Sequence, residues 1–359
     1  MKVHLVSGFL GSGKTTAIIL AAKYFIRQGK KVGVITNDQG KYLVDTAFVR
    51  LNDIPAVEVN GSCFCCNYRA FNDSFDKLTS TLKPDLIFAE SVGTCADIVA
   101  TVAKPLLDYK ATQPADTSLT TFCDCRLLNA YLKGEELPFQ ENVIYIFEQQ
   151  IVEAGILVIH KIDLISDDKL KETQKLLAEK YPQKDILAMS SLDGQGVSLW
   201  LDRLEKPQPG RLDSVDIDYD TYGSGEQLLA WYDARVRISG KDGSGVSGMQ
   251  CLINQIRTRV KNFSLPVGHI KFLLNDGSRF EKFSLLTGAG DEQAEKFLQG
   301  SWKDRLDLII NTRVQSTSIV LQDLFWEAIQ EYADEQTRWK ILDEDAFHPG
   351  YPAPKIRIV

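Results

Sequence analysis

The chain has 359 residues, of which 44% are hydrophobic and 25% charged, and its formal net charge is −7 at pH 7. These proportions are typical of a globular protein and exclude a largely disordered chain, while the length predicts about two domains. The acidic balance argues against a nucleic-acid partner, because binding phosphates usually requires an excess of basic residues. We find no apolar run near the ~20 residues that span a membrane and no signal peptide, so we expect a cytoplasmic protein without a membrane partner.

Short apolar runs alternate with amphipathic stretches over residues 1–205. Apolar runs without internal alternation are typical of strands buried on both faces, and the stretches between them are typical of right-handed helical crossovers. Strands are expected over residues 3–7, 31–36, 85–89, 119–122, 155–160 and 185–189, and helices over 14–28 and 167–180. The pattern predicts an α/β domain with three layers and a mostly parallel sheet.

The pattern changes character after residue 205. Pro207, Pro209 and Gly210 cannot continue a helix, so residues 206–226 are expected to form a linker. Apolar and charged residues then alternate between Tyr232 and Ile238, which is typical of a sheet with one solvent-facing side. Further strands are expected over 267–274, 279–286 and 306–314, and helices over 249–263 and 317–332. We predict a smaller α+β domain with an antiparallel sheet over 227–340 and an irregular tail over 341–359.

A glycine-rich motif follows the first expected strand. Residues 8–16, Gly-Phe-Leu-Gly-Ser-Gly-Lys-Thr-Thr, fit the phosphate-binding pattern G-x-x-x-x-G-K-[ST] and lead into a helix. Backbone N–H groups there converge on phosphate oxygens at the positive end of the helix dipole. Lys14 is expected to reach the β and γ phosphates, and Thr15 to bind Mg²⁺. The expected phosphate-binding residues are Gly11, Ser12, Gly13, Lys14, Thr15 and Thr16.

Two later strand ends supply candidate partners for this loop. Glu90 ends an apolar strand at the sheet edge where α/β proteins bind ligands, and Gly93 follows three residues later. This acidic-x-x-Gly pattern predicts a switch that senses the γ-phosphate, with Glu90 near the Mg²⁺ ion. The expected strand 155–160 ends at His160 and continues as His160-Lys161-Ile162-Asp163. This sequence is close to the GTPase pattern Asn-Lys-x-Asp, in which the Asp accepts hydrogen bonds from guanine.

The loop at residues 190–196 completes the expected base site. It follows the last strand of the first domain and resembles the loop that closes over the guanine base in GTPases, with Ser190 and Ser191 in the contact positions. Together with His160, Lys161 and Asp163, these residues predict that GTP is the nucleotide. Adenine lacks the matching pair of donors, so a carboxylate at residue 163 discriminates against ATP.

Three of the seven cysteines, Cys63, Cys65 and Cys66, fall within four positions. Thiolates this close together suit Zn²⁺ or another thiophilic metal, with a fourth ligand from water, another side chain or a second subunit, which leaves a homodimer open. The alternative is a set of small buried hydrophobic residues. That alternative is favoured for the remaining cysteines, which are Cys95, Cys123, Cys125 and Cys251.

In chain order, the phosphate loop, Cys-Phe-Cys-Cys, Glu-Ser-Val-Gly and His-Lys-Ile-Asp resemble the CobW-type metallochaperone GTPases, relatives of UreG and HypB. The resemblance covers roughly the first 205 residues. It implies Mg²⁺-dependent GTP hydrolysis coupled to delivery of Zn²⁺ or Co²⁺, or to cobalamin metabolism, with a metal-requiring or corrinoid protein as client. It also implies a metal at Cys63, Cys65 and Cys66, and a first switch in which Asp38 helps to hold Mg²⁺ or water. His160 departs from the family's Asn.

Three functions fit these motifs. The first is a slow GTPase, with Lys14, Asp38 and Glu90 positioning the reacting phosphate, whose nucleotide state controls metal binding. The second is an ATP-dependent enzyme, such as a small-molecule kinase, in which the cysteines are structural; the substitution at His160 keeps it open. The third is a regulator that binds nucleotide without hydrolysing it. We favour the first, on the strength of the resemblance.

Overall fold

A computed structural model describes residues 1–41, 43–110, 113–207, 212–241, 243–286, 298, 301–331 and 337–359. The chain divides into two compact units. The first consists of Met1–Gln39, Asn52–Gly225 and Tyr351–Val359, and the second of Gly40–Leu51 and Glu226–Gly350. Each unit therefore includes a short segment that lies far in sequence from the rest of that unit.

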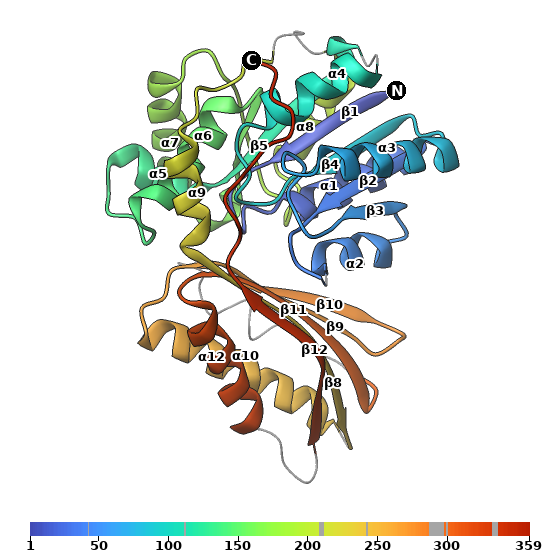
Figure 1. The fold of residues 1–359 in the computed structure, drawn as a ribbon, viewed down its shortest axis with the longest axis vertical. Coiled ribbons are helices and arrows are strands. Elements are labelled where there is room, and N and C mark those ends of the chain that lie inside the picture. The colour runs from blue at the N-terminus through green and yellow to red at the C-terminus, as the bar shows by residue number, and fades with distance from the viewer. Residues whose placement is uncertain are drawn as a thin grey trace. The chain divides into compact units, whose positions relative to one another are not determined.

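The first unit is built on a seven-stranded parallel sheet in the order β3-β2-β4-β1-β5-β6-β7 (Figure 1). Its strands are β1 (Lys2–Ser7), β2 (Val32–Asn37), β3 (Ala56–Val59), β4 (Leu86–Glu90), β5 (Thr117–Asp124), β6 (Ile156–His160) and β7 (Asp185–Met189). Glu90 pairs in register with Val6 on one side and Thr36 on the other. The carboxyl ends of β1, β2 and β4 therefore meet at one edge of the sheet.

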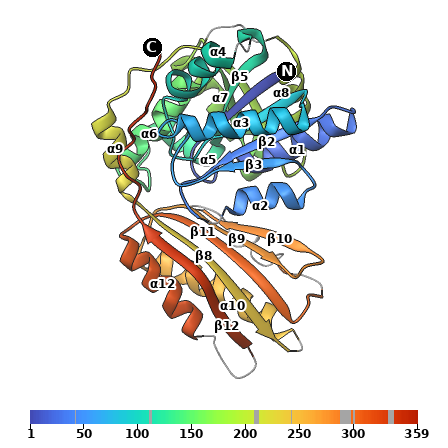
Figure 2. The same ribbon diagram turned by 45° about the vertical axis from the view of Figure 1, so that its right-hand side comes forward.

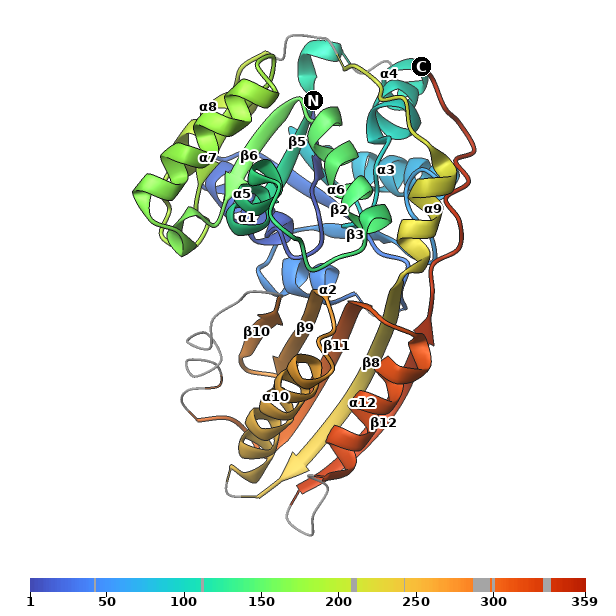
Figure 3. The same ribbon diagram turned by 90° about the vertical axis from the view of Figure 1, so that its left-hand side faces the viewer.

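Helices lie on both sides of this sheet (Figure 3). They are α1 (Lys14–Arg27), α3 (Tyr68–Leu82), α4 (Lys104–Lys110), α5 (Cys125–Lys133), α6 (Glu141–Glu153), α7 (Asp167–Lys180), α8 (Val197–Glu205) and α9 (Tyr219–Gln227). A π-helical turn, Val99–Ala103, leads directly into α4. The predicted three-layer α/β domain with a parallel sheet is confirmed. Strand β3 was not predicted from the sequence, and neither were α3, α5, α6 and α8.

The second unit holds a five-stranded antiparallel sheet in the order β10-β9-β11-β8-β12 (Figure 2). Its strands are β8 (Leu229–Gly240), β9 (Val267–Asn275), β10 (Phe280–Leu285), β11 (Arg305–Gln315) and β12 (Thr337–Phe347). Helices α10 (Ser244–Asn262) and α12 (Ser318–Glu331) cover one face and share a core with alternate strand residues such as Tyr232, Ile270 and Ile310. The predicted antiparallel α+β domain is confirmed.

The other face of this sheet differs from expectation. The alternation between Tyr232 and Ile238 predicted a solvent-facing side, yet Asp233 is fully buried. The segment Gly40–Leu51, which contains helix α2 (Val44–Leu51), belongs to the same unit, and α2 contacts β9 and β11. A side chain at Gly40 would place its Cβ 1.6 Å from a carboxylate oxygen of Asp233, so the close approach requires glycine. Part of the sheet face that was expected to be exposed to solvent is therefore covered by residues 40–51, which connect β2 to β3.

Two boundaries also differ. The expected irregular tail over 341–359 is wrong in its first part, because β12 continues to Phe347 and pairs with β8. The expected linker over 206–226 contains most of α9, which begins at Tyr219. Residues 208–211 of that linker lie outside the described residues. Residue 332, the last residue of the helix expected over 317–332, also lies outside them. Among the described helices, none combines the length and apolar character needed to cross a membrane.

Candidate nucleotide site and metal centre

The glycine-rich loop connects the end of β1 to the start of α1. Gly8, Gly11 and Gly13 have positive φ angles of 134°, 71° and 95°. A Cβ at Gly8 would lie 2.2 Å from the backbone oxygen of Phe122, and one at Gly13 would lie 2.5 Å from the His160 ring. The loop therefore needs glycine for both conformation and space. It sets backbone N–H groups at the N-terminus of α1, as a phosphate site requires.

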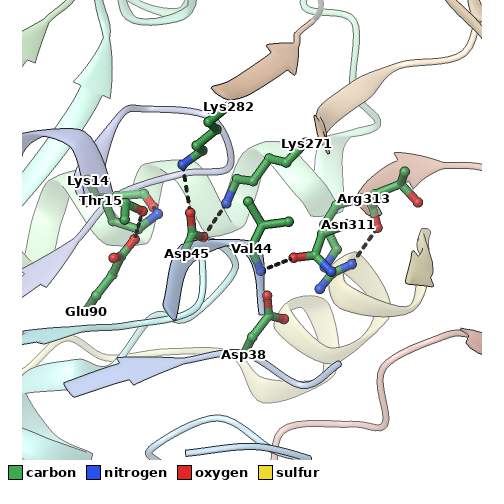
Figure 4. Close-up of polar contacts among 12 residues, drawn as sticks. Lys14, Thr15, Asp38, Val44, Asp45, Glu90, Lys271, Lys282, Asn311 and Arg313 are labelled. Carbon is green, nitrogen blue, oxygen red and sulfur yellow. Dashed lines mark hydrogen bonds and ion pairs between the residues drawn. The ribbon is translucent and has the colours of Figure 1, made fainter. Parts of the chain in front are cut away.

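Side chains of the loop form contacts suited to a magnesium–nucleotide complex. The Lys14 ammonium donates to the Gly8 carbonyl at 2.7 Å, and the Thr15 hydroxyl donates to the Glu90 carboxylate at 2.8 Å (Figure 4). All three side chains are at most 7% exposed. The Ser12 hydroxyl is buried and has no hydrogen-bond partner within the described part of the chain. The glycine cradle and this cluster of ammonium, hydroxyl and carboxylate fit the predicted ligands.

His160 ties the end of β6 to the phosphate loop. Its Nδ1 faces the Ser12 carbonyl and must donate a proton to it, so Nε2 accepts from the Ser191 hydroxyl at 2.8 Å. Burial lowers the pKa of His160 to about 4, which keeps the ring neutral at pH 7. Both ring nitrogens are thereby engaged within the protein. His160 acts here as a brace between two loops, a role that the base-recognition hypothesis did not foresee.

Lys161 also faces the phosphate loop. Its ammonium donates to the Gly11 carbonyl at 2.6 Å and pairs with Asp124 at 3.1 Å. Burial opposes ionisation of Asp124, but hydrogen bonds from Arg126 and the charge of Lys161 outweigh it and lower the pKa of this carboxyl. Sequence reasoning missed Asp124, although its place at the end of β5, on the ligand-binding edge, was a usable signal.

The other predicted nucleotide residues divide into two groups. Asp163 is exposed just beyond Lys161, and Ser190 is buried with its hydroxyl accepting the Leu192 and Asp193 N–H groups. On the phosphate side, Asp38 is 8% exposed after β2 and accepts from the Gln39 N–H. Gly93 follows β4, where a Cβ would meet Leu10 of the phosphate loop at 2.6 Å. The predicted residues thus lie on loops that leave the same edge of the sheet.

The three clustered cysteines lie on the loop between β3 and α3. Their sulfur atoms are within 4.8 Å of one another, with Cys65 and Cys66 3.8 Å apart. Cys63 and Cys65 are 2% exposed, and Cys66 is half-buried. The loop ends at the N-terminus of α3, whose partial positive charge favours thiolates. The geometry fits a thiophilic metal, as predicted from the spacing.

Asn37, the last residue of β2, fixes this loop. Its amide donates to the carbonyls of Val59 and Ser62 at 3.0 and 2.8 Å, and its oxygen accepts the Phe64 N–H at 2.8 Å. The residue that braces the cysteine loop therefore directly precedes Asp38 of the first switch. Sequence reasoning placed Asn37 beside a switch but gave it no link to the cysteines, because the pairing is long-range.

A fourth cysteine, Cys95, lies beside the cluster on another loop. Among the described residues, the sulfur atoms that all lie within 4.8 Å of one another are those of Cys63, Cys65 and Cys66. The thiol of Cys95, two residues after Gly93, is a hydrogen-bond partner of both Cys63 and Cys65. Hydrogen bonds from Cys65 and the neighbouring thiols lower the pKa of Cys63, while the same contact with Cys63 raises the pKa of Cys65. The sequence favoured a small buried residue at Cys95, and its side chain is fully buried; its contacts with Cys63 and Cys65 were not foreseen.

The end of the described chain lies against the same cysteines. In residues 351–359, the Ala353 N–H donates to the Cys66 sulfur at 3.2 Å and the Lys355 N–H donates to the Cys65 carbonyl at 3.3 Å. Arg357 pairs with the buried Asp97 at 2.7 Å. The segment therefore spans the cysteine loop and the loop after β4. Nothing in its composition predicted this position.

The segment after Asp38 is bound inside the second unit. Asp45 of α2 forms ion pairs with Lys271 and, at 2.9 Å, with Lys282 (Figure 4). The backbone N–H of Val44 donates to Asn311 at 2.7 Å, and Asn311 donates to Asp233 at 3.0 Å. These contacts hold Val44 and Asp45 against the antiparallel sheet of the same unit.

The fold and the glycine loop define a P-loop nucleotide-binding domain. The family model described as CobW/HypB/UreG, nucleotide-binding domain, matches residues 2–188, more than half of the chain. The protein therefore belongs to the CobW/HypB/UreG family, as the motifs indicated.

Two curated relatives show how far the similarity extends. The chain is 24% identical over 221 residues to the zinc-regulated GTPase metalloprotein activator 1 of Dictyostelium discoideum, covering 52% of this chain and 45% of that protein. It is 29% identical over 183 residues to the zinc chaperone YeiR of Escherichia coli (strain K12), covering 48% and 50%. The matches thus span about half the length of these relatives. The solved structure of HypB from Helicobacter pylori in complex with nickel has 18% identity and a TM-score of 0.43, over 61% of this chain and 92% of that one.

Proposed function

We propose that the protein is a Mg²⁺-dependent GTPase that binds Zn²⁺ or Co²⁺ at Cys63, Cys65 and Cys66 and passes the metal to a client protein. In this proposal the nucleotide state sets the affinity for the metal. The names of the relatives, a zinc chaperone and a zinc-regulated GTPase metalloprotein activator, support zinc as cargo. The family resemblance supports a role in cobalamin metabolism. A homodimer is proposed as one source of a fourth metal ligand, which a second subunit would supply.

One observation carries the proposal. The side chain of Asn37 makes three hydrogen bonds to the backbone of the cysteine loop, and the next residue is Asp38 of the first switch. Segments of this kind are ordered by γ-phosphate and Mg²⁺ and released on hydrolysis. In this proposal a movement of Asp38 shifts Asn37, and the hydrogen bonds of the Asn37 side chain pass the shift to the loop that carries the cysteines.

The chain's own residues can support phosphoryl transfer to water. In this proposal Lys14 binds the β and γ phosphates, while Thr15 and Glu90 would hold Mg²⁺, which neutralises phosphate charge when bound. In this proposal Asp38 orients the attacking water and the Gly93 N–H binds the γ-phosphate. Water adds to the γ-phosphorus, the bond to the bridging oxygen of GDP breaks, and phosphate leaves. Catalysis is then mostly electrostatic positioning.

The decisive experiment titrates Zn²⁺ and Co²⁺ into apo protein, GDP-bound protein and protein bound to a non-hydrolysable GTP analogue, each with Mg²⁺. We expect the analogue to tighten metal binding, and the metal to tighten analogue binding by the same factor, about 5–150-fold. Cys65→Ser, which removes a central thiolate, should abolish the tight site. Equal affinities in all three states would contradict the coupling, and tight binding by Cys65→Ser would place the metal elsewhere.

Nucleotide choice tests the base site separately. GTP should displace a fluorescent guanine nucleotide far better than ATP, and Asp163→Asn should reduce that preference because an amide cannot accept from both guanine donors. The exposed carboxylate of Asp163 supports this assignment. Both ring nitrogens of His160 are engaged inside the protein, so the proposal assigns the preference for guanine to Asp163. Equal displacement by ATP and GTP would favour the ATP-dependent alternative.

A further inference from the structure

We propose that Cys95 is the fourth ligand of the metal site, which makes it a four-thiolate site with one ligand on the loop that senses the γ-phosphate. This inference rests on the proposed function, because it assumes that Cys63, Cys65 and Cys66 bind the metal. It adds a ligand that the Cys-x-Cys-Cys spacing does not contain.

The position of Cys95 supports this role. Its side chain is fully buried, as are those of Cys63 and Cys65 to within 2%, and its thiol interacts with both. The cluster thus has a buried side, where Cys95 lies, and a half-exposed side at Cys66. Zinc bonded to four sulfurs at about 2.3 Å places neighbouring sulfurs about 3.8 Å apart, so binding would draw these four thiols around one centre.

The half-exposed side is covered by backbone. The Ala353 N–H donates to the Cys66 sulfur, and an N–H directed at a ligand sulfur is the kind of outer contact that orients a thiolate and offsets its charge. The N-terminus of α3, next to Cys66, adds a partial positive charge. These contacts support the negative charge that four thiolates carry around a divalent ion, and none of them supplies a competing ligand atom.

Cys95 is held firmly relative to Gly93. The side-chain amide of Gln150 donates to the carbonyls of both residues, at 3.1 Å to Gly93 and 2.9 Å to Cys95. The Cys95 N–H donates to the Val92 carbonyl at 3.0 Å, closing a tight turn. A shift of Gly93 toward a γ-phosphate therefore moves the Cys95 sulfur with it. The metal would gain or lose one ligand with the nucleotide state.

Metal preference follows from the ligand set. A closed site of four thiolates selects Zn²⁺ and disfavours ions that prefer oxygen ligands, whereas three thiolates with a water leave an open position. In the GTP-bound state the site is closed and retains zinc. When the loop after β4 relaxes, the site returns to three thiolates and a client's ligand takes the fourth position.

X-ray absorption at the zinc edge tests the coordination without any mutation. Wild-type protein with one Zn²⁺ and the GTP analogue should show four sulfur ligands. Three sulfurs with one oxygen or nitrogen would overturn this inference and leave the proposed function standing. A protein that binds no zinc at these cysteines would defeat the proposed function itself, so the two failures are distinguishable.

Matched variants supply the second readout. With Co²⁺ in place of Zn²⁺, Cys95→Ser should lose one thiolate's share of the sulfur-to-cobalt charge-transfer absorption. Its metal affinity should also depend less on the nucleotide, because only the path through Asn37 remains. Cys123→Ser removes another buried cysteine of the same unit, in β5, and should change neither property. Equal absorption in Cys95→Ser and wild type would overturn the assignment.

Discussion

The segments that follow β2 and β4 leave the same edge of the parallel sheet, but they are anchored by different chemistry. Residues 40–51 belong to the second unit and are held by a charged carboxylate, Asp45, between two lysines. Residues 91–99 stay in the first unit and are held by the amide of Gln150, the Cys95 thiol and the buried carboxyl of Glu153, which accepts the Val99 N–H.

The pKa values of the two carboxyls show the contrast. Burial opposes ionisation of Asp45, but Lys271 and Lys282 outweigh it and hold its pKa well below the usual range. Burial raises the pKa of Glu153 to about 8, because the facing charges are too weak to offset it. The two segments are therefore held by different kinds of carboxyl, an ionised one in the second unit and a protonated one in the first.

The largest effect is expected from a substitution that impairs nucleotide binding, on which the proposed responses of both segments depend. Lys14→Ala deletes the ammonium that binds the β and γ phosphates and should reduce GTP turnover by about 100-fold or more. Metal affinity should then no longer respond to nucleotide. Turnover assays and Zn²⁺ titrations measure both results. Lys23→Ala, which changes an exposed lysine of the same helix, is the control and should behave as wild type. Unchanged turnover in Lys14→Ala would contradict the P-loop assignment.

The next substitution weakens the anchor of residues 40–51 and leaves that of residues 91–99 intact. Asp45→Asn keeps the side-chain volume but removes the negative charge that forms ion pairs with Lys271 and Lys282, whose side chains are 14% and 12% exposed. We expect the free energy of unfolding to fall by about 3 kcal/mol, measured by denaturant unfolding. The metal affinity of the nucleotide-free cysteine site should be unchanged, because those thiols lie in the other unit.

Lys41→Ala provides the comparison for that loss. Its ion pair with Asp345 is 3.8 Å long and has side chains 57% and 39% exposed. Solvent-exposed pairs contribute little, so the change should stay within about 0.5 kcal/mol. A similar loss in both variants would mean that the burial of the Asp45 cluster has no special effect.

A smaller effect concerns the segment that covers the cysteines. Arg357→Ala removes the ion pair to Asp97 and a hydrogen bond to the Val215 carbonyl. Residues 351–359 should then open more readily, by about 1 kcal/mol, and a thiol reagent should modify Cys66 about fivefold faster. Lys355→Ala keeps its backbone bond to Cys65 and should label at the wild-type rate. Equal labelling rates in all three proteins would show that this segment does not protect the thiol.

Local patterns predicted much of the fold. Buried strands such as β1 and β6, and the amphipathic helix α7, follow from residue periodicity, which acts over neighbouring residues. The order of strands, the short strand β3 and the placement of residues 40–51 with the second unit depend on contacts between distant residues. Asp233 shows most clearly what local patterns cannot predict. The alternation of apolar and charged residues indicated that this side chain faces solvent, yet a segment nearly 200 residues earlier in the chain covers it.

The site divides in the same way. The glycine loop was predictable because positive φ angles and close backbone approaches require glycine in a fixed pattern. The cluster of Cys63, Cys65 and Cys66 was visible in the spacing. The contributions of Asn37, Gln150 and Cys95 were not, because each acts through a partner at least 20 residues away. The comparison between the two segments depends on these long-range contacts.

Glu153→Gln should have the smallest effect on the site. It tests whether the carboxyl of Glu153, which accepts the Val99 N–H, is protonated in the folded protein. Wild-type Glu153 keeps its proton in the folded state up to about pH 8, whereas the unfolded chain loses it above the usual pKa of 4.5. The unfolded state therefore binds fewer protons between these values, and this carboxyl lowers the free energy of unfolding as pH rises, by at most about 1.4 kcal/mol per pH unit. Asp45 has the opposite sign, since its lowered pKa stabilises the fold above about pH 4 and that contribution is lost in acid.

Gln is neutral at every pH and can still accept the Val99 N–H. The variant should match wild type near pH 5 and become the more stable of the two as the pH approaches 8, with nucleotide and metal affinities unchanged. Unfolding free energies measured from pH 5 to 8 check this result, and Asp45→Asn serves as the comparison that should show no such gain on the alkaline side. Parallel pH profiles for Glu153→Gln and wild type would mean that Glu153 is ionised in the fold. The two segments would then share one kind of anchor, because a charged carboxylate would hold each of them.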